Sequence, residues 1–205
     1  MKYLLTIEHR RNPKNFGFYS LLLLFTLIYF LVVISFLKSI LLFQAAAFIC
    51  GWVTWTYGEY YWHRFLMHAR GKTIAAGAQG NHLYHHQHPT ELRIKTLHRV
   101  LMSMIFLLLI ILSAVLQNYI TFFTGLFFGF ILYCYVHVLL HHQWSSKLFP
   151  RLLRYHVHHH CKYPNLCFGV SVPWWDDFFG TVPPNGIVIP IRILEFYFRK
   201  PEDLS

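Results

Sequence analysis

The sequence predicts an all-α integral membrane protein, in which four transmembrane helices form two hairpins and carry a cytoplasmic helical cap with a histidine-rich site. Three observations predict this fold class. Of the 205 residues, 56% are hydrophobic and 13% are charged, which departs from the average soluble domain on both counts. Four apolar stretches are long enough to cross a hydrocarbon core of about 30 Å. Finally, nearly all Lys and Arg residues fall on one side of these stretches.

The apolar stretches define the order of the spans, since about 20 residues at helical rise cross the bilayer. The predicted spans lie at about residues 18–37, 40–57, 100–116 and 119–140. The first is the clearest, with the sequence "FYSLLLLFTLIYFLVVISFL". Lys38 and Ser39 alone separate the first two spans, and Gln117 and Asn118 the last two, so each pair must form an antiparallel hairpin. Because no linker or repeat interrupts the chain, we expect one membrane-embedded domain over residues 1–205.

The basic residues give the spans a direction, because cytoplasmic loops collect Lys and Arg. Apart from Lys38, every Lys and Arg precedes the first span, lies between the second and third, or follows the fourth. Both termini and the central loop should therefore be cytoplasmic, in a bacterial inner membrane or, in a eukaryotic host, in the endoplasmic reticulum. Topology and attraction to anionic headgroups explain the net charge of +10, so no nucleic-acid partner is predicted.

We interpret the first apolar run as a retained span rather than a cleaved signal peptide. It is longer than a signal-peptide core of about 7–15 residues, and residues 35–37 offer no small-residue cleavage site, although Ala45 to Ala47 superficially do. The four cysteines indicate no disulfide framework. Two lie inside predicted spans, and Cys161 and Cys167 lack a Cys-x-x-Cys spacing on the side expected to be reducing.

Histidine is the unusual feature of this apolar chain. All of the 15 histidines except His9 and His98 fall in four groups on the predicted cytoplasmic side. The groups are "HRFLMH" (His63, His68), "HLYHHQH" (His82, His85, His86, His88), "HVLLHH" (His137, His141, His142) and "HVHHH" (His156, His158, His159, His160). Because buried polar groups are costly unless they have partners, four such groups indicate a common site.

The spacing within the groups brings ten imidazoles together. Residues at i, i+3 and i+4 share a helix face, which unites His82 with His85 and His86, His137 with His141, and His156 with His159 and His160. His63 and His68 are about 140° apart on a straight helix, so they would approach a common site from two sides or use a local bend. Ten ligands exceed the needs of one metal, so the count favours two neighbouring metal ions with open positions. Imidazole suits several transition metals, and the histidines alone do not name one.

The motifs "HRFLMH", "HLYHH", "HVLLH" and "YHVHHH", followed by "FGVSVPWWDDFFGT", resemble the histidine boxes and C-terminal signature of the fatty acid hydroxylase/sterol desaturase superfamily. The nearest branch is the fatty acid 2-hydroxylases, and the resemblance runs from about Trp62 to Val182. It implies a four-span membrane protein with a dimetal centre in a cytoplasmic cap. The metal would be iron in the active form, with zinc as a substitute in purified protein. Such a centre uses O2 and two electrons to place a hydroxyl at C2 of an acyl chain, free or in a sphingolipid such as ceramide.

Carried over by motif position, the resemblance implies ten metal ligands. They are His63, His68, His82, His85, His86, His137, His141, His156, His159 and His160. His88, His142 and His158 would then be additional histidines that contact the ligands without binding the metal.

Family members in eukaryotes often carry an N-terminal cytochrome b5 domain, whereas this chain begins almost directly with its first span. We therefore expect a separate electron donor, of the cytochrome b5 or ferredoxin type with its reductase.

Three carboxylates are candidates for orienting the ligands. Glu59 lies one helical turn before His63 and could accept the second N–H of that imidazole, or it could be an interfacial acid paired with a nearby Arg. Asp176 and Asp177 belong to the terminal signature and could act in the same way. A hydrolase with paired carboxylates is the alternative for these two, but no nucleophile or complementary base stands out near them.

Aromatic residues near the predicted boundaries fit either an aromatic belt or the lining of a lipid entrance. They are Trp52, Trp55, Tyr57, Tyr60, Tyr61, Trp62, Trp174, Trp175, Phe178 and Phe179. The end segment "IVIPIRILEFYF" is expected to pack on the cap or lie along the interface, and Pro190 argues against one uninterrupted helix.

Other functions explain the histidines less well. A transmembrane haem carrier would place histidine pairs deep in the spans, yet the first and third spans have none at their centres. A membrane metal transporter would need ligands near the bilayer middle, and a closed structural zinc site needs only about four. Within the superfamily, the alternatives are a sterol desaturase or methyl oxidase and a carotenoid ring hydroxylase.

Overall fold

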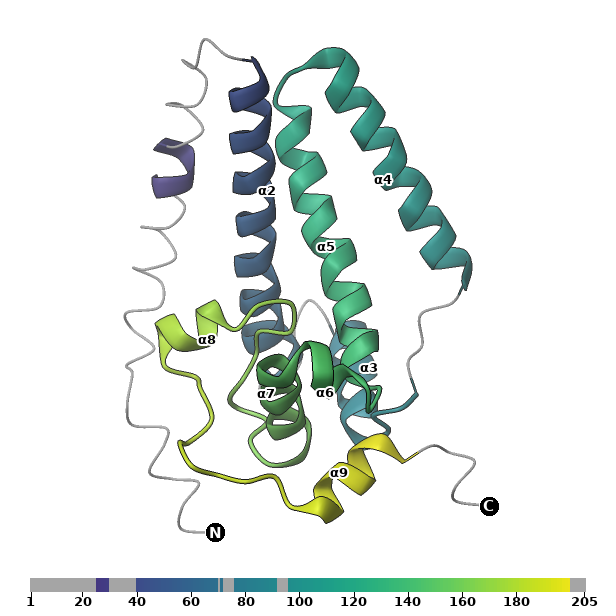
Figure 1. Ribbon diagram of the computed structural model, residues 1–205, viewed down its shortest axis with the longest axis vertical. Coiled ribbons are helices and arrows are strands. Elements are labelled where there is room, and N and C mark those ends of the chain that lie inside the picture. The colour runs from purple at the N-terminus through teal and green to yellow at the C-terminus, as the bar shows by residue number, and fades with distance from the viewer. Residues whose placement is uncertain (1–24, 30–39, 70, 72–75, 92–95, 200–205) are drawn as a thin grey trace. The chain divides into compact units, whose positions relative to one another are not determined.

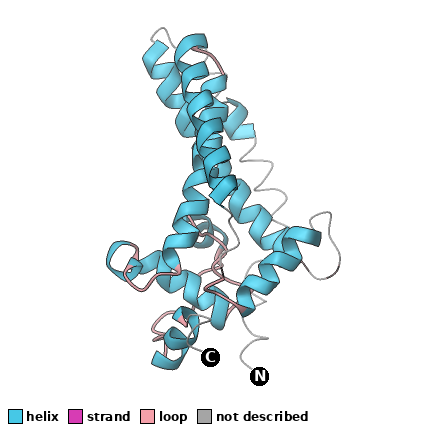
Figure 2. Ribbon diagram, turned by 90° about the vertical axis from the view of Figure 1, so that its right-hand side faces the viewer, coloured by secondary structure: helices cyan, strands magenta, loops and turns pink. Residues whose placement is uncertain are grey.

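The computed structural model describes residues 25–29, 40–69, 71, 76–91 and 96–199 (Figure 1). Within these ranges every regular element is helical, and Figure 2 shows helices joined by loops, which confirms the all-α class for the described part of the chain. The elements are α2 (Ile40–Trp62), η2 (His63–Met67), α3 (Ala76–Gln87), α4 (Thr96–Leu116), α5 (Ile120–Leu140), α6 (Ser145–Leu148), α7 (Pro150–Cys161), α8 (Trp174–Phe179) and α9 (Ile191–Phe198).

Three of the described helical segments are long and apolar enough to cross a membrane. They are Ile40–Met67, Leu97–Leu116 and Ile120–Leu140, which correspond to the second, third and fourth predicted spans. The second span was expected to end near Tyr57, but the helix continues to Trp62 and into the η2 turn. The first predicted span, at 18–37, lies outside the described residues except for 25–29, which are helical. The four-span count and the two hairpins therefore stay predictions.

The chain divides into two compact units. The first comprises Met1–Thr54 and Ile105–Gly129, and the second comprises Trp55–Met104 and Phe130–Ser205. The sequence-based expectation of a single domain stays a prediction.

In the first unit, α2 and α5 approach each other backbone to backbone at two glycines. A Cβ atom at Gly51 would lie 1.9 Å from the carbonyl oxygen of Phe122, and one at Gly125 would lie 2.0 Å from that of Phe48. Small residues allow membrane helices to pack this closely. Glycine is therefore required at both positions.

A polar cluster connects three helices of the same unit. The hydroxyls of Ser113 on α4 and Thr124 on α5 lie 2.6 Å apart, and Nε2 of Gln44 on α2 donates to the carbonyl oxygen of Ser113 at 3.0 Å. Both hydroxyl-bearing residues are buried. A buried polar group costs free energy unless it is hydrogen-bonded. Each side chain of this cluster has a hydrogen-bond partner on another helix of the cluster, which removes that cost.

The apolar core of the second unit is built by α5, α7, α9 and the segment before α8. Its buried members are Val136, Leu140, Leu153, Val157, Val170 and Tyr197. Helix α7 begins with Pro150 at its first turn, where proline's missing N–H costs nothing. Because Leu153 and Val157 anchor α7 in this core, the histidines that follow on the same helix are held inside the unit.

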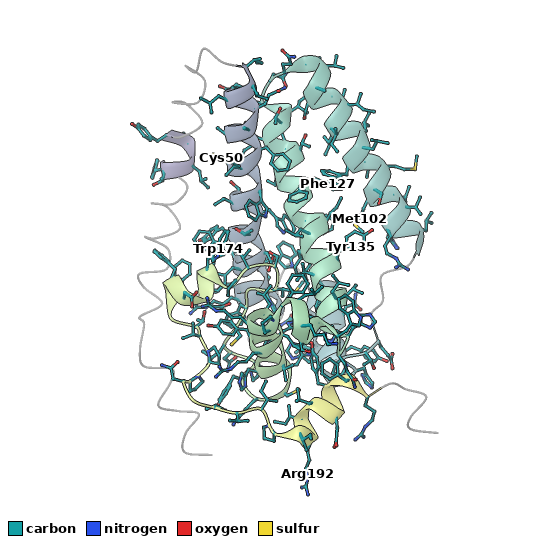
Figure 3. All side chains as sticks on the ribbon, viewed as in Figure 1. Cys50, Met102, Phe127, Tyr135, Trp174 and Arg192 are labelled. Carbon is teal, nitrogen blue, oxygen red and sulfur yellow. The ribbon has the colours of Figure 1, made fainter. Side chains whose placement is uncertain are left out.

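Helix α9 packs on α7 and is the described end of the chain. Pro190 is its N-cap, so the proline does separate this helix from the preceding residues, as the sequence indicated. Tyr197 is fully buried, whereas Ile191 is 72% exposed and Arg192 projects outward (Figure 3). Helix α9 thus packs one of its faces against the rest of the second unit.

Candidate metal centre

Ten histidine rings of the second unit meet in two groups of five. The first group is His63, His68, His82, His86 and His159, and the second group is His85, His137, His141, His156 and His160. In each group, one ring nitrogen of every member lies within 4.8 Å of those of the others. These are the ten residues that the sequence indicated, and the structure divides them into two sets.

A π-helical turn brings His63 and His68 to the same side. The turn spans His63–Met67, and the backbone N–H of His68 donates to the carbonyl oxygen of His63 at 3.2 Å. Such a turn closes from residue i to residue i+5, whereas on a straight α-helix the two residues would point about 140° apart. Of the two arrangements left open by the sequence, the local bend is the one that forms.

Helices α3 and α7 each contribute to both groups. Helix α3 contributes His82 and His86 to the first group and His85 to the second. Helix α7 contributes in the opposite proportion, with His159 in the first group and His156 and His160 in the second. The rings of His86 and His160 stack across the boundary, with centroids 4.2 Å apart. The two groups are therefore neighbours, as a centre with two metal ions requires.

The nitrogen atoms of the first group are arranged as ligands of a cation. Nε2 of His82 lies 3.0 Å from Nε2 of His63, 2.7 Å from that of His68 and 2.9 Å from that of His86. A neutral imidazole carries a single N–H, so these contacts cannot all be hydrogen bonds. Several lone pairs that meet at one point fit a metal ion.

The second group has the same character. Nε2 of His141 lies 3.1 Å from Nε2 of His85 and 3.1 Å from that of His156. Nε2 of His85 is also 3.0 Å from that of His137. The donor set again fits a metal held by imidazole nitrogens.

Two members of the first group have a fixed tautomer. Nδ1 of His63 donates to the carbonyl oxygen of Phe168 at 2.6 Å, and Nδ1 of His159 donates to that of Leu166 at 2.7 Å. A carbonyl oxygen only accepts hydrogen bonds, so the proton of each ring sits on Nδ1 and the lone pair of Nε2 faces the group. No sequence pattern predicts these two carbonyls, because main-chain atoms leave no signature in residue types.

Burial keeps the imidazoles neutral. It lowers the pKa of His68 and His85 to about 4 and that of His86 to about 3. It also lowers the pKa of His159 and His160 well below the usual value, with help from neighbouring histidines. Since metals bind the unprotonated ring, these side chains are ready to act as ligands at pH 7.

Glu59 holds a backbone segment rather than a histidine. Its Oε1 accepts hydrogen bonds from the backbone N–H groups of Val170 at 2.7 Å and Ser171 at 2.9 Å, and its Oε2 accepts one from Oγ of Ser171 at 2.5 Å. The direct bond expected between Glu59 and His63 is not made, because Nδ1 of His63 donates to Phe168. The carboxylate therefore contacts the segment that orients His63.

Asp176 holds the preceding residues of the same segment. Its Oδ1 accepts from the backbone N–H of Phe168 at 2.9 Å and from Oγ1 of Thr181 at 2.7 Å, and its Oδ2 accepts from the backbone N–H of Gly169 at 2.8 Å. Burial raises the pKa of Asp176 to about 6, so its carboxylate is still ionised at pH 7 and accepts all three hydrogen bonds.

The other residues considered as supports for the ligands lie elsewhere. His88 and His142 are exposed and stack on neighbouring aromatic rings. Asp177 is exposed and pairs with Arg151 at 2.6 Å. His158 is buried but belongs to neither group of described histidines. Adjacent residues such as Asp176 and Asp177 thus have different surroundings.

Tyr197 of α9 covers the second group. Its ring contacts the rings of His141, His156 and His160, with centroids 4.9, 6.3 and 5.6 Å apart. No motif in the sequence pointed to this tyrosine. The only signal was the apolar end segment that contains it.

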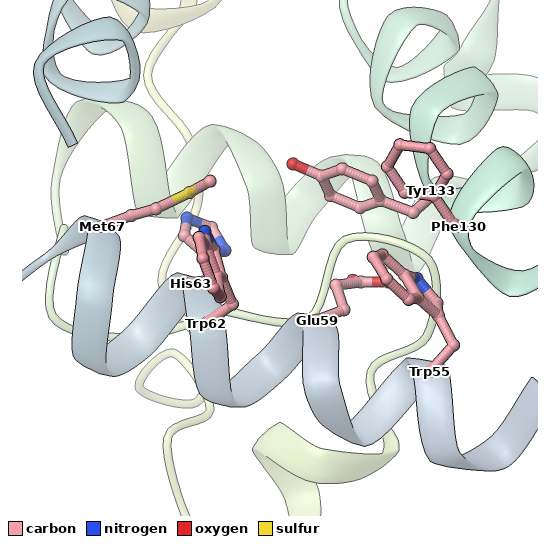
Figure 4. A pocket seen from close by; sticks show the side chains of 7 residues that line it. All are labelled: Trp55, Glu59, Trp62, His63, Met67, Phe130 and Tyr133. Carbon is pink, nitrogen blue, oxygen red and sulfur yellow. The ribbon is translucent and has the colours of Figure 1, made fainter. Parts of the chain in front are cut away.

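A cavity of about 370 Å³ adjoins the first group. Its lining residues are Trp55, Glu59, Trp62, His63, Met67, Phe130 and Tyr133, and Figure 4 shows Phe130 and Tyr133 opposite the side chains of α2 and η2. His63 is thus both a member of the first histidine group and part of the cavity wall. Among the aromatic residues singled out in the sequence, Trp55 and Trp62 line this cavity.

Comparisons with known proteins identify a family for this chain. The family model for fatty acid hydroxylases matches residues 48–181. A dihydroceramide fatty acyl 2-hydroxylase of Arabidopsis thaliana is 34% identical over 146 residues, covering 65% of this chain and 59% of the relative. A ceramide very long chain fatty acid hydroxylase of Saccharomyces cerevisiae is 33% identical over 149 residues, covering 68% and 38%. A fatty acid 2-hydroxylase of Rattus norvegicus is 31% identical over 150 residues, covering 67% and 40%.

A solved structure is similar as well. Full-length scs7p, with only its hydroxylase domain visible, has a TM-score of 0.54 at 28% identity, covering 82% of this chain and 66% of that chain. The match to each of the three curated relatives spans less than two thirds of the relative's length.

Proposed function

The chain belongs to the fatty acid hydroxylase family, and from that premise we propose that it is an oxygen-dependent hydroxylase that inserts a hydroxyl at C2 of a fatty acyl chain, free or in a sphingolipid such as ceramide. One observation carries the proposal: His63 belongs to the first histidine group and also lines an apolar cavity. A bound acyl chain would therefore lie against a metal ligand. The names of the Arabidopsis and rat relatives support position 2.

We propose that each histidine group holds one iron ion, with all ten histidines as ligands. When bound, such a centre supplies the reaction of O2 with an unactivated C–H bond, which no side chain can perform alone. The chain's own contribution is to keep the imidazoles unprotonated by burial and to direct their lone pairs to two points. In the first group, the carbonyls of Leu166 and Phe168 fix that direction for two of the rings.

The cavity is suited to an acyl chain. Trp55, Trp62, Met67 and Phe130 provide apolar contacts, and burying each methylene of a substrate is worth about 0.8 kcal/mol. The carboxylate of Glu59 accepts hydrogen bonds from Val170 and Ser171. The burial of this polar group beside the cavity is therefore offset by donors of the protein itself. The apolar side chains of the cavity would hold the carbons near the carbonyl end of the substrate beside His63 and exclude water there.

The membrane arrangement is part of the proposal. We propose four spans in two hairpins within a single domain, with the termini and both histidine groups on the cytoplasmic side of a bacterial inner membrane or of the endoplasmic reticulum. The distribution of Lys and Arg supports this orientation. Because the reaction consumes two electrons, a protein donor of the cytochrome b5 or ferredoxin type with its reductase would complete the system.

Lipid mass spectrometry of expressing cells tests the function. Cells with the wild-type chain should gain 2-hydroxy acyl lipids, and the purified protein should contain about two metal ions per chain. His159→Ala should abolish the product, whereas His98→Ala is a matched control because His98 is exposed and outside both groups. Metal without 2-hydroxy lipid would redirect the search to sterols and carotenoids. A protein without tightly bound metal would contradict the proposed chemistry.

A further inference from the structure

The two histidine groups differ in how their rings are held. In the first group, Nδ1 of His63 and of His159 donate to backbone carbonyls. In the second group, Nδ1 of His141 and of His156 and both ring nitrogens of His160 are buried without a hydrogen-bond partner among the described residues. Two rings of the first group therefore have an orienting hydrogen bond to the backbone, which these three rings of the second group lack.

The two carbonyls lie on a segment, Leu166–Ser171, whose backbone is held at every step. Four consecutive N–H groups donate to carboxylates: those of Phe168 and Gly169 to Asp176, and those of Val170 and Ser171 to Glu59. Carboxylates that accept backbone N–H bonds make strong, charge-assisted contacts. The segment is thus a rigid support for the two imidazoles.

The local backbone shows how closely this segment is constrained. Cys167 has a φ of 61°, which is uncommon for a non-glycine residue, and its N–H donates to the carbonyl oxygen of Thr181 at 2.8 Å. A Cβ atom at Gly169 would lie 2.2 Å from the carbonyl oxygen of Val172 and 2.9 Å from Oδ2 of Asp176. Such conformations persist where the surroundings over-determine them, often at functional sites.

Ring orientation bears directly on metal affinity. A ligand whose tautomer and direction are set before binding loses little freedom when the metal arrives, and partners of this kind change metal affinity by about 10- to 100-fold. In the second group, the rings of His141, His156 and His160 lack such a hydrogen bond among the described residues.

We propose that the two metal positions are unequal: the first group, beside the cavity, binds its ion more tightly and keeps it when the second group has lost its own. Glu59 and Asp176 are the positioning residues, which act through Leu166–Ser171 on His63 and His159. This inference rests on the proposed function, because it assumes that both groups hold metal.

Chelator competition on the detergent-purified, metal-loaded full chain tests the inference without an activity assay. As the chelator concentration rises, the metal content should fall in two steps that are at least about tenfold apart, with a plateau near one ion per chain. Two matched variants identify the retained ion. His68→Ala should remove the tight step, and His137→Ala should remove the weak step.

A second pair of variants tests the positioning residues. Asp176→Asn should weaken the tight step by about 10- to 100-fold and leave the weak step in place. Asp177→Asn, the control, should change neither step, because Asp177 pairs with Arg151 on the surface. A merely structural role for Asp176 would instead weaken both steps together and would overturn its assignment. If Asp176→Asn does not fold, Glu59→Gln is used against the same control.

The outcomes separate the inference from the proposed function. Loss of both ions in one step from the wild-type protein, or a tight step that survives His68→Ala and vanishes in His137→Ala, would overturn the inference and leave the hydroxylase proposal intact. A purified protein that binds no metal would overturn both.

Discussion

The ring of Tyr197 stacks on the ring of His141, with centroids 4.9 Å apart and planes inclined by 27°. The hydroxyl of Tyr197 donates to the carbonyl oxygen of Leu140 at 3.1 Å. Helix α9 therefore contacts the end of α5 through both the ring and the hydroxyl of one fully buried side chain. The last described helix of the chain thus covers the second histidine group.

Two substitutions at Tyr197 separate these contacts. Tyr197→Phe removes only the hydrogen bond and should lower the free energy of unfolding by about 1 kcal/mol. Tyr197→Ala also removes the ring, which should cost about 3–5 kcal/mol and lower the metal content. Thermal unfolding and metal analysis of the purified variants measure both effects. Equal behaviour of the two variants would show that the stacked ring does not support His141.

The close approach of α2 and α5 predicts opposite effects at two glycines of one helix. Gly51→Ala should be strongly destabilising, because its Cβ would overlap the backbone of Phe122. Gly58→Ala is the control, since nothing lies within 4 Å of a Cβ there, and it should be neutral or stabilising by up to about 1 kcal/mol through helix propensity. Unfolding in detergent measures both, and a well-folded Gly51→Ala would contradict the packing described for the first unit.

Acid should destabilise the metal-free protein. Burial lowers the folded-state pKa of His68 and His85 to about 4 and that of His86 to about 3, whereas the unfolded value is about 6.5. Below pH 6.5 these three histidines bind more protons in the unfolded chain than in the folded one, so the stability that they contribute falls as the pH drops from about 6.5 toward 4 and is constant above. Unfolding at pH 7.5, 6.0 and 5.0 measures this, and equal stability at the three values would contradict it.

The cavity wall predicts a change in catalysis without a change in metal content. Phe130→Ala removes a ring that lines the cavity and should lower kcat/KM by at least about tenfold through lost substrate contacts. Tyr135→Ala is the control on the same helix, because Tyr135 is exposed and does not line the cavity. Both variants should keep the metal content of the wild type. Equal activity of the two would remove the cavity from the acyl-binding site.

Local sequence patterns were sufficient to predict much of the helical fold and of the candidate metal centre. Runs of about 20 apolar residues predict helices from their composition alone, and three of the four expected spans correspond to described helices. The histidine spacings likewise depend on helix geometry within a few residues. This is why the ten residues that converge in the structure could be selected from the sequence.

The division of those histidines was decided by tertiary structure. His82 and His85 lie three residues apart on one helix, yet they join different groups because His159 of α7 approaches one of them and His137 of α5 approaches the other. Asp176 and Asp177 are neighbours in sequence, but the first is buried against Phe168 and Gly169 and the second faces solvent.

The carbonyls that orient His63 and His159 come from residues that are distant in sequence or belong to an irregular segment. Such contacts depend on where the folded backbone passes, and no periodicity of residue types encodes that path. The sequence by itself determined which residues are apolar enough to cross a membrane and which histidines are candidate metal ligands. The tertiary structure alone decided which histidines lie in the same group and which carboxylates hold the segment beside them.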